Sequence, residues 1–115
     1  MVRIGTWNLE NLFRPEDEAG PRDPAAYEAK LAAMGIAMPA SRVVTSAIAT
    51  GHALRAEYPR GTRVFVVGMR GLREALLADG HFVEDHDAPE LVVQGADFEL
   101  TYATLRRATL LIRAG

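Results

Sequence analysis

The 115-residue sequence contains no cysteine, one lysine among its 13 basic residues and no long apolar run. Without cysteine, disulfides and thiol catalysis are excluded. No stretch approaches the roughly 18 apolar residues that a membrane-spanning helix needs, and the first five residues lack the apolar core of a signal peptide. The net charge of −2, without a basic block, gives no electrostatic footprint for nucleic acid. These absences predict a cytoplasmic location with neither membrane nor nucleic-acid partners.

What is present is a composition typical of one small globular domain, with 49% apolar and 24% charged residues. Apolar runs that suit strands alternate with stripes at helical spacing, and Pro, Gly and charged residues separate them. The expected strands are residues 2–7, 43–44, 63–67, 81–83 and 91–94. The expected helices are residues 24–34, 46–58, 71–79 and 101–113. A loop rich in proline and charge is expected over residues 14–24.

The alternation of strand and helix predicts an α/β fold with a small, partly parallel sheet and flanking helices. The apolar run at residues 63–67 is typical of a strand buried on both faces. We expect it to share one sheet with residues 91–94, under helices near 71–79 and 101–113. In the last helix, one side carries the residues Tyr102, Leu105, Ala108 and Ile112.

Amide and carboxylate side chains follow the first expected strand. Asn8 and Glu10 project to the same side if that strand continues, and such oxygen donors can hold a divalent cation beside a phosphate. The competing interpretation makes Trp7 a core anchor and the amides turn formers.

The segment Val-Arg-Ile-Gly-Thr-Trp-Asn-Leu-Glu-Asn-Leu-Phe, residues 2–13, resembles the opening strand of the endonuclease/exonuclease/phosphatase superfamily. This resemblance covers residues 1–33. It implies that Asn8 lies against the scissile phosphate and that Glu10 contributes to a magnesium (Mg2+) site. The superfamily's later Gln-Glu pair and its catalytic Asp-His pair have no counterpart here.

Three other groups of polar residues have simpler interpretations. Residues 81–87 contain two histidines and three carboxylates, but their spacing is that of a solvated turn rather than a metal site. Residues 68–71 lack the spacing of a phosphate-binding loop, which favours a plain connection from strand to helix. His52 has no Ser or Cys partner in view and is predicted to be a surface or packing residue.

A longer resemblance begins at Met34. The segments Val-Val-Thr-Ser-Ala (43–47), Gly-Thr-Arg-Val-Phe-Val-Val-Gly (61–68), Gly-Leu-Arg-Glu-Ala-Leu (71–76) and Phe-Glu-Leu-Thr-Tyr (98–102) resemble, in order and spacing, a haloacid dehalogenase-superfamily phosphatase. The implied subgroup has a large α/β cap and is similar to para-nitrophenyl phosphatases and bacterial sugar-phosphatase-like proteins. The resemblance implies Mg2+ as cofactor, a cap that shapes substrate access, and Asp97 as a substrate-binding residue.

The chemistry of that superfamily is missing from the sequence. No Asp-x-Asp nucleophile loop follows the first strand, and the later lysine and acidic pair are absent. We therefore expect two segments, residues 1–33 and 34–115, joined as a fragment or chimera without activity alone. The alternatives are a magnesium-dependent phosphoesterase or nuclease that uses Asn8 and Glu10, and a cap-like binding module. The cap-like surface would join a homodimer or an intact phosphatase.

Overall fold

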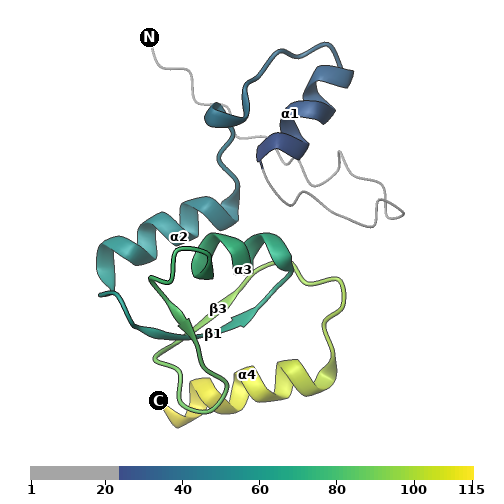
Figure 1. Ribbon diagram of the computed structural model, residues 1–115. Coiled ribbons are helices and arrows are strands. Elements are labelled where there is room, and N and C mark those ends of the chain that lie inside the picture. Colours follow the sequence, from purple (N-terminus) through teal and green to yellow (C-terminus); the bar gives the residue numbers. More distant parts are fainter. Residues whose placement is uncertain (1–23) are drawn as a thin grey trace. The chain divides into compact units, whose positions relative to one another are not determined.

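The computed structural model describes residues 24–115 (Figure 1). The chain divides into two compact units, Met1–Val43 and Val44–Gly115. Among residues 24–115, every helix is too short or too polar to traverse a bilayer. The strand expected at residues 2–7, with Asn8 and Glu10, lies outside the described residues. The domain boundary expected after residue 33 stays a prediction.

In the first unit, the helix α1 (Pro24–Ala33) buries Tyr27 and Leu31, four residues apart on one side. The helix ends before Gly35, whose φ of 78° suits glycine better than any other residue. This confirms the helix that the sequence predicts, although Met34 is 56% exposed.

The expected strand at residues 43–44 is wrong. The 3₁₀ turn η2 (Ala40–Arg42) precedes this point, and its hydrogen bonds end with the Val43 N–H, which donates to the Ala40 carbonyl at 3.0 Å. Val44 is 68% exposed and pairs with no described strand. Two β-branched residues favour an extended backbone, but without a neighbouring strand they do not make a sheet.

The second unit contains a three-stranded sheet in the order β2-β1-β3, and both pairs are parallel. Its strands are β1 (Arg63–Val67), β2 (Val83–Glu84) and β3 (Leu91–Gln94). The pairing of β1 with β3 runs from Val64 opposite Leu91 to Val67 opposite Gln94. The predicted α/β fold with a parallel sheet is therefore confirmed.

Three helices flank this sheet: α2 (Ser46–Glu57), α3 (Arg70–Leu77) and α4 (Tyr102–Ala114). Figure 1 shows α2 and α3 on one side of the sheet and α4 on the other. Threonine side chains cap two of them, because Thr45 Oγ1 accepts the Ile48 N–H at 3.2 Å and Thr101 Oγ1 accepts the Thr104 N–H at 3.1 Å. The cap at Thr45 and the length of α2 agree with the sequence pattern.

The strand β1 is buried on both faces, as predicted, and its side chains alternate between two apolar clusters. The cluster beneath α2 and α3 comprises Val64, Val66, Leu72, Leu76, Phe82 and Val93. The cluster beneath α4 comprises Phe65, Val67 and Ala108, with Val92 and Leu111 at its border. The second unit is thus a three-layer α/β/α arrangement with two small cores.

Two sequence-based details need correction. The weak strand expected at 81–83 begins only at Val83, because Phe82 turns into the core and is 2% exposed. The side of α4 that carries Tyr102 and Ile112 does not face the sheet, since these residues are 80% and 64% exposed. The helix packs instead through Ala108 and Leu111, which reach Phe65, Val67 and Val92.

Candidate functional site

The carboxyl ends of β1 and β3 lie side by side and form the edge where parallel α/β sheets bind ligands. A glycine follows each strand, Gly68 after β1 and Gly95 after β3, and Leu72 of α3 packs against both. A Cβ on Gly68 would lie 2.8 Å from Leu72 Cδ2, and one on Gly95 would lie 3.0 Å from the same atom. The glycines therefore make room for an apolar side chain that fills this edge from within the unit.

The loop after β1 is a plain strand-to-helix connection, as predicted. The Met69 N–H donates to the Ala96 carbonyl at 3.2 Å, which ties this loop to the one that follows β3. Arg70 begins α3 and pairs with Glu74 one turn later on the exposed side of the helix. The loop brings no further charged partner to the edge.

Asp97, the substrate-binding residue that the sequence indicates, lies in the loop between β3 and α4. It is half-buried, and its Oδ1 accepts the Glu99 N–H at 3.0 Å. This local hydrogen bond shapes the turn that leads into α4. The structure brings no second candidate residue to Asp97, and the predicted catalytic and metal residues Asn8 and Glu10 lie outside the described residues.

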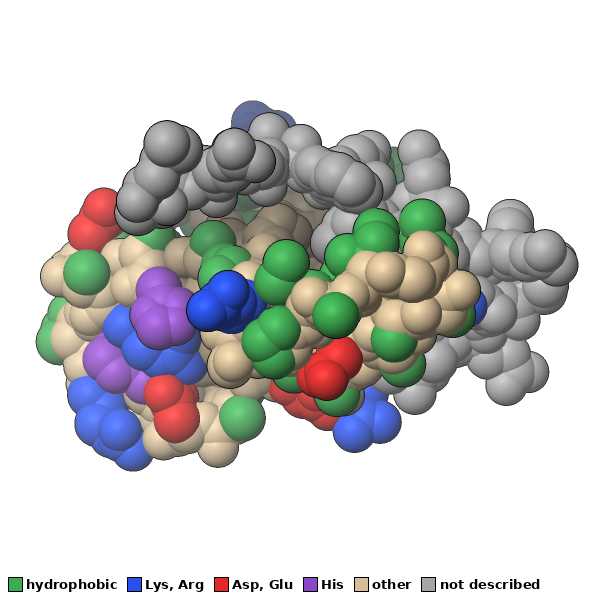
Figure 2. Space-filling model, turned by 90° about the horizontal axis from the view of Figure 1, so that it is seen from above, with side chains coloured by type: hydrophobic (Ala, Val, Ile, Leu, Met, Phe, Trp, Pro, Cys, Tyr) green, Lys and Arg blue, Asp and Glu red, His purple; other side chains and the backbone are tan. Residues whose placement is uncertain are grey.

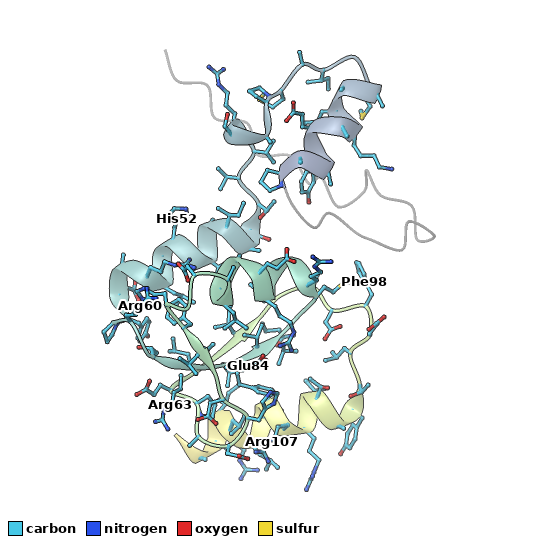
Figure 3. All side chains as sticks on the ribbon, in the orientation of Figure 1. His52, Arg60, Arg63, Glu84, Phe98 and Arg107 are labelled. Carbon is cyan, nitrogen blue, oxygen red and sulfur yellow. The ribbon has the colours of Figure 1, made fainter. Side chains whose placement is uncertain are left out.

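The acidic turn after β2 crosses from one side of β1 to the other. Asp85 Oδ1 accepts the N–H groups of Asp87 and Ala88 at 2.8 and 3.1 Å, and these bonds hold the pKa of the Asp85 carboxyl below its usual range. The carboxylate of Asp87 lies 2.7 Å from Arg107 NH2. Figure 3 shows Arg107 on α4, beneath this turn.

Glu84, at the end of β2, and His86 of the turn also contact protein groups. Glu84 forms an ion pair with Arg73, and the His86 ring meets the Phe65 ring edge to face, with 5.3 Å between centroids. Arg107 Nε donates to the His86 carbonyl at 2.9 Å. These contacts hold the crossover against the sheet, which agrees with the interpretation of residues 81–87 as a turn.

His52 lies on the exposed side of α2 and points away from the sheet (Figure 3). This confirms its prediction as a surface histidine. On the face seen in Figure 2, basic, acidic and histidine side chains are interspersed rather than gathered by sign.

A cluster of charged residues that sequence reasoning did not identify lies at the carboxyl end of α3. Arg55 of α2 donates from NH2 to the Ala75 carbonyl at 2.8 Å and from Nε to Asp79 Oδ2 at 2.9 Å. Asp79 Oδ1 accepts the His81 N–H at 3.0 Å, and Arg60 NH2 donates to the Asp79 carbonyl at 2.9 Å. A guanidinium at a helix carboxyl end satisfies carbonyls that the helix leaves open.

This cluster predicts a specific acid sensitivity. The hydrogen bond from Arg55, followed by that from the His81 N–H, lowers the pKa of Asp79 from 3.8 to about 2. Because the folded-state pKa is depressed, Asp79 stabilises the fold above pH 3.8, and this contribution is lost as the pH falls towards 2. In Asp79→Asn we expect a lower free energy of unfolding at pH 7 and a shallower loss between pH 4 and 2 in urea titrations.

Arg55→Gln is the matched control for the acid sensitivity. It removes the guanidinium, the larger cause of the lowered pKa of Asp79, but keeps the hydrogen bond from the His81 N–H. The pH dependence of its stability should therefore lie between that of the unmodified chain and that of Asp79→Asn. If both single variants lost stability between pH 4 and 2 as the unmodified chain does, Asp79 would not be the source of the acid sensitivity.

Residues 19–81 match the family model of haloacid dehalogenase-like hydrolases, which is more than half of the chain. The acid sugar phosphatase of Staphylococcus saprophyticus is 40% identical over 112 residues, which cover 97% of this chain and 42% of that protein. The acid sugar phosphatase of Staphylococcus epidermidis is 35% identical over 94 residues, which cover 82% of this chain and 36% of that protein.

Solved structures of phosphatases share the fold. The glycerol phosphate phosphatase of Mycobacterium tuberculosis superposes with a TM-score of 0.72 at 32% identity, covering 82% of this chain and 29% of that one. The 4-nitrophenylphosphatase of Thermotoga maritima superposes with a TM-score of 0.70 at 35% identity, covering 81% and 35%. The chain belongs to the haloacid dehalogenase-like hydrolases, and it spans about two fifths of the length of the acid sugar phosphatases it matches.

The predicted resemblance to haloacid dehalogenase-type phosphatases is therefore confirmed. The comparisons give no support to the second resemblance, that of residues 1–33 to the endonuclease/exonuclease/phosphatase superfamily. The alignment with the staphylococcal protein covers 97% of the chain and so runs through most of those residues as well. The division of the chain into two segments of different origin stays a prediction.

The glycerol phosphate phosphatase structures contain magnesium or calcium. Within residues 24–115 of this chain, no three His, Asp or Glu side chains lie where they could hold a metal ion together. The carboxylates near the sheet are engaged by arginines and backbone N–H groups instead. The donor set of the described residues therefore does not fit a divalent cation.

Proposed function

We propose that this chain forms one part of a haloacid dehalogenase-like phosphatase that hydrolyses phosphate monoesters of sugars or similar small molecules. In this proposal, residues 44–115 are the cap-like part that limits access to the phosphate site, and they have no turnover alone. The observation that carries the proposal is the family match over residues 19–81, which extends from α1 through α3. Relatives that are phosphatases by name support the reaction class.

The geometry of the sheet edge supports a role in access rather than in bond cleavage. Leu72 fills the space between Gly68 and Gly95 at the carboxyl end of the sheet. This edge therefore presents an apolar side chain at the place where a catalytic nucleophile would be needed. Asp97 is the carboxylate nearest in sequence to the end of β3. Because its Oδ1 is engaged by the Glu99 N–H, Oδ2 can accept a hydrogen bond from a substrate hydroxyl.

The first test is an assay of the purified chain with para-nitrophenyl phosphate and with sugar phosphates over a magnesium titration. We expect no turnover above buffer, because the charge stabilisation that a nucleophile and metal site supply is absent from the described residues. Glu10→Ala is purified in parallel. Magnesium-dependent turnover that disappears in Glu10→Ala would overturn the proposal in favour of a complete active site in this chain.

A graft gives the positive test. Residues 44–115 replace the aligned segment of the Staphylococcus saprophyticus acid sugar phosphatase, which supplies the remaining parts of the enzyme. We expect the hybrid to hydrolyse sugar phosphates, and Asp97→Ala in the hybrid to raise KM more than it lowers kcat. A folded hybrid without activity would contradict the proposed role.

A further inference from the structure

Residues 41–45 connect the two compact units, and this segment holds an exposed arginine. Arg42 and Val44 are both exposed, Val44 by 68%, and Val44 pairs with no described strand. The boundary between the units lies directly after Val43. Few contacts cross such a boundary, and exposed connections are the preferred sites of proteolytic cleavage. Arg42 therefore lies where an endopeptidase that cleaves after arginine would find accessible backbone.

One helical turn keeps the backbone around Arg42 closed. In the 3₁₀ turn η2, the Arg42 N–H donates to the Pro39 carbonyl at 2.9 Å. The Val43 N–H donates to the Ala40 carbonyl at 3.0 Å. Pro39 and Val43, which flank the turn, already have extended backbone angles, the conformation in which a peptide pairs with a strand of a binding cleft. Opening of this single turn therefore extends the chain around Arg42 and brings the buried Val43 to the surface.

The other arginines of the described residues lie in backbone that neighbouring elements hold in place. Arg60 is also exposed and lies in a turn, but the Gly61 N–H after it donates to the His81 carbonyl at 2.7 Å. The next residue, Thr62, is buried, and its N–H donates to the Pro59 carbonyl at 3.2 Å. The remaining arginines lie in α2, β1, α3 and α4: Arg55, Arg63, Arg70, Arg73, Arg106, Arg107 and Arg113.

The second unit supplies all the described residues of both apolar clusters. The members of the two clusters and the residues at their borders lie between Ala47 and Leu111. The three strands pair with one another within residues 63–94. Cleavage after Arg42 removes none of these contacts. The fragment of residues 43–115 should therefore stay folded and resist further digestion.

We propose that the bond between Arg42 and Val43 is a processing site for an endopeptidase of trypsin-like specificity, which separates the two units and releases residues 43–115 as a folded fragment. The chemistry is a hydrolysis. The bond from the Arg42 carbonyl carbon to the Val43 nitrogen breaks, and water supplies the hydroxyl group of the new carboxyl terminus and a hydrogen to the new amino terminus.

Limited digestion of the full chain with trypsin tests the site, with the products followed over time by mass spectrometry. We expect the first cleavage between residues 24 and 110 to follow Arg42, and residues 43–115 to accumulate. Arg113 lies outside this range because the last turn of a helix frays. A first cut after Lys30 or after any other arginine in the range overturns the proposal. An uncut Arg42–Val43 bond, or a fragment that is degraded as it forms, does so as well.

Arg42→Gln should slow the appearance of the fragment at least about tenfold, because trypsin recognises a basic side chain before the bond that it cleaves. Arg60→Gln is the matched control, since Arg60 is also an exposed arginine in a turn. Its rate should stay within about twofold of that of the unmodified chain. Circular dichroism verifies that both variants are folded. Equal rates in the two variants would overturn the proposal.

A side chain of α1 holds η2 closed, which allows a test that leaves the cleaved sequence unchanged. Glu28 Oε2 accepts the Ala40 N–H at 2.8 Å. Glu28→Ala removes this hydrogen bond, so η2 should open more often and the fragment should appear about fivefold faster. Glu57→Ala removes an exposed carboxylate from α2 and should leave the rate unchanged. If Glu28→Ala were cleaved no faster than Glu57→Ala, opening of η2 would not be the step that exposes the bond, and the proposal would fail.

Discussion

Phe82→Ala is expected to lower the free energy of unfolding by about 3–5 kcal/mol, the range for a phenylalanine removed from a core. The side chain is 2% exposed and packs in the cluster with Val64, Leu76 and Val93 beneath α2 and α3. Its loss would leave a cavity that the three-stranded sheet has few side chains to fill. Urea unfolding followed by circular dichroism measures the change.

Two polar neighbours add to the effect of Phe82. The His81 ring meets it edge to face with 4.7 Å between centroids, and the Arg55 guanidinium carbon lies 5.8 Å from its centroid. Since domains of this size have a total stability of roughly 5–15 kcal/mol, the variant should lose a large share of it. Phe82→Leu keeps most of the volume and should cost less than half as much.

Phe98→Ala is the matched control, because Phe98 is 79% exposed and should change the stability by less than about 0.5 kcal/mol. Equal losses in Phe82→Ala and Phe98→Ala would mean that the segment before β2 does not anchor the core.

The sequence predicts those elements whose signals are local. The apolar run of β1 lies between Gly61 and Gly68, and its length and composition are sufficient to place a buried strand. Thr45 marks the start of α2 because a threonine oxygen satisfies an N–H of the first turn. Parallel pairing follows from the helix α3 between β1 and β2, since such a connection returns the chain to the same end of the sheet.

Contacts between distant residues could not be predicted in this way. Arg55 reaches Ala75 across 20 residues, and nothing near Arg55 distinguishes it from the other arginines on helices. Arg73 NH2 donates to the Val66 carbonyl at 2.9 Å, on a strand whose neighbour β2 is only two residues long. Both arginines satisfy backbone carbonyls that only the tertiary arrangement leaves open.

Which side of α4 is exposed could likewise not be predicted from local sequence signals. Helical spacing groups Tyr102, Leu105, Ala108 and Ile112, but it does not say which side meets the sheet. The sheet ends at β3 among the described strands, so it contacts only the side with Ala108 and Leu111. For the candidate site, the position after the first expected strand indicated Asn8 and Glu10, and the resemblance to haloacid dehalogenase-type phosphatases implied Asp97. Only Asp97 lies in the described part, where local turn geometry explains its contact.

Gly51→Val should lower the free energy of unfolding by about 3 kcal/mol, because α2 and α3 approach closely at this glycine. A Cβ there would lie 3.0 Å from the Ala75 carbonyl oxygen and 2.6 Å from Arg55 NH1, and the branched methyl groups would displace the α3 backbone as well as the guanidinium. Ala53→Val is the control, since Ala53 is exposed on the same helix and reports only the lower helix propensity of valine, about 0.5 kcal/mol. Both variants are measured by urea unfolding. If Gly51→Val cost no more than Ala53→Val, the helices would not be held together at this point, and Arg55 could not bridge them.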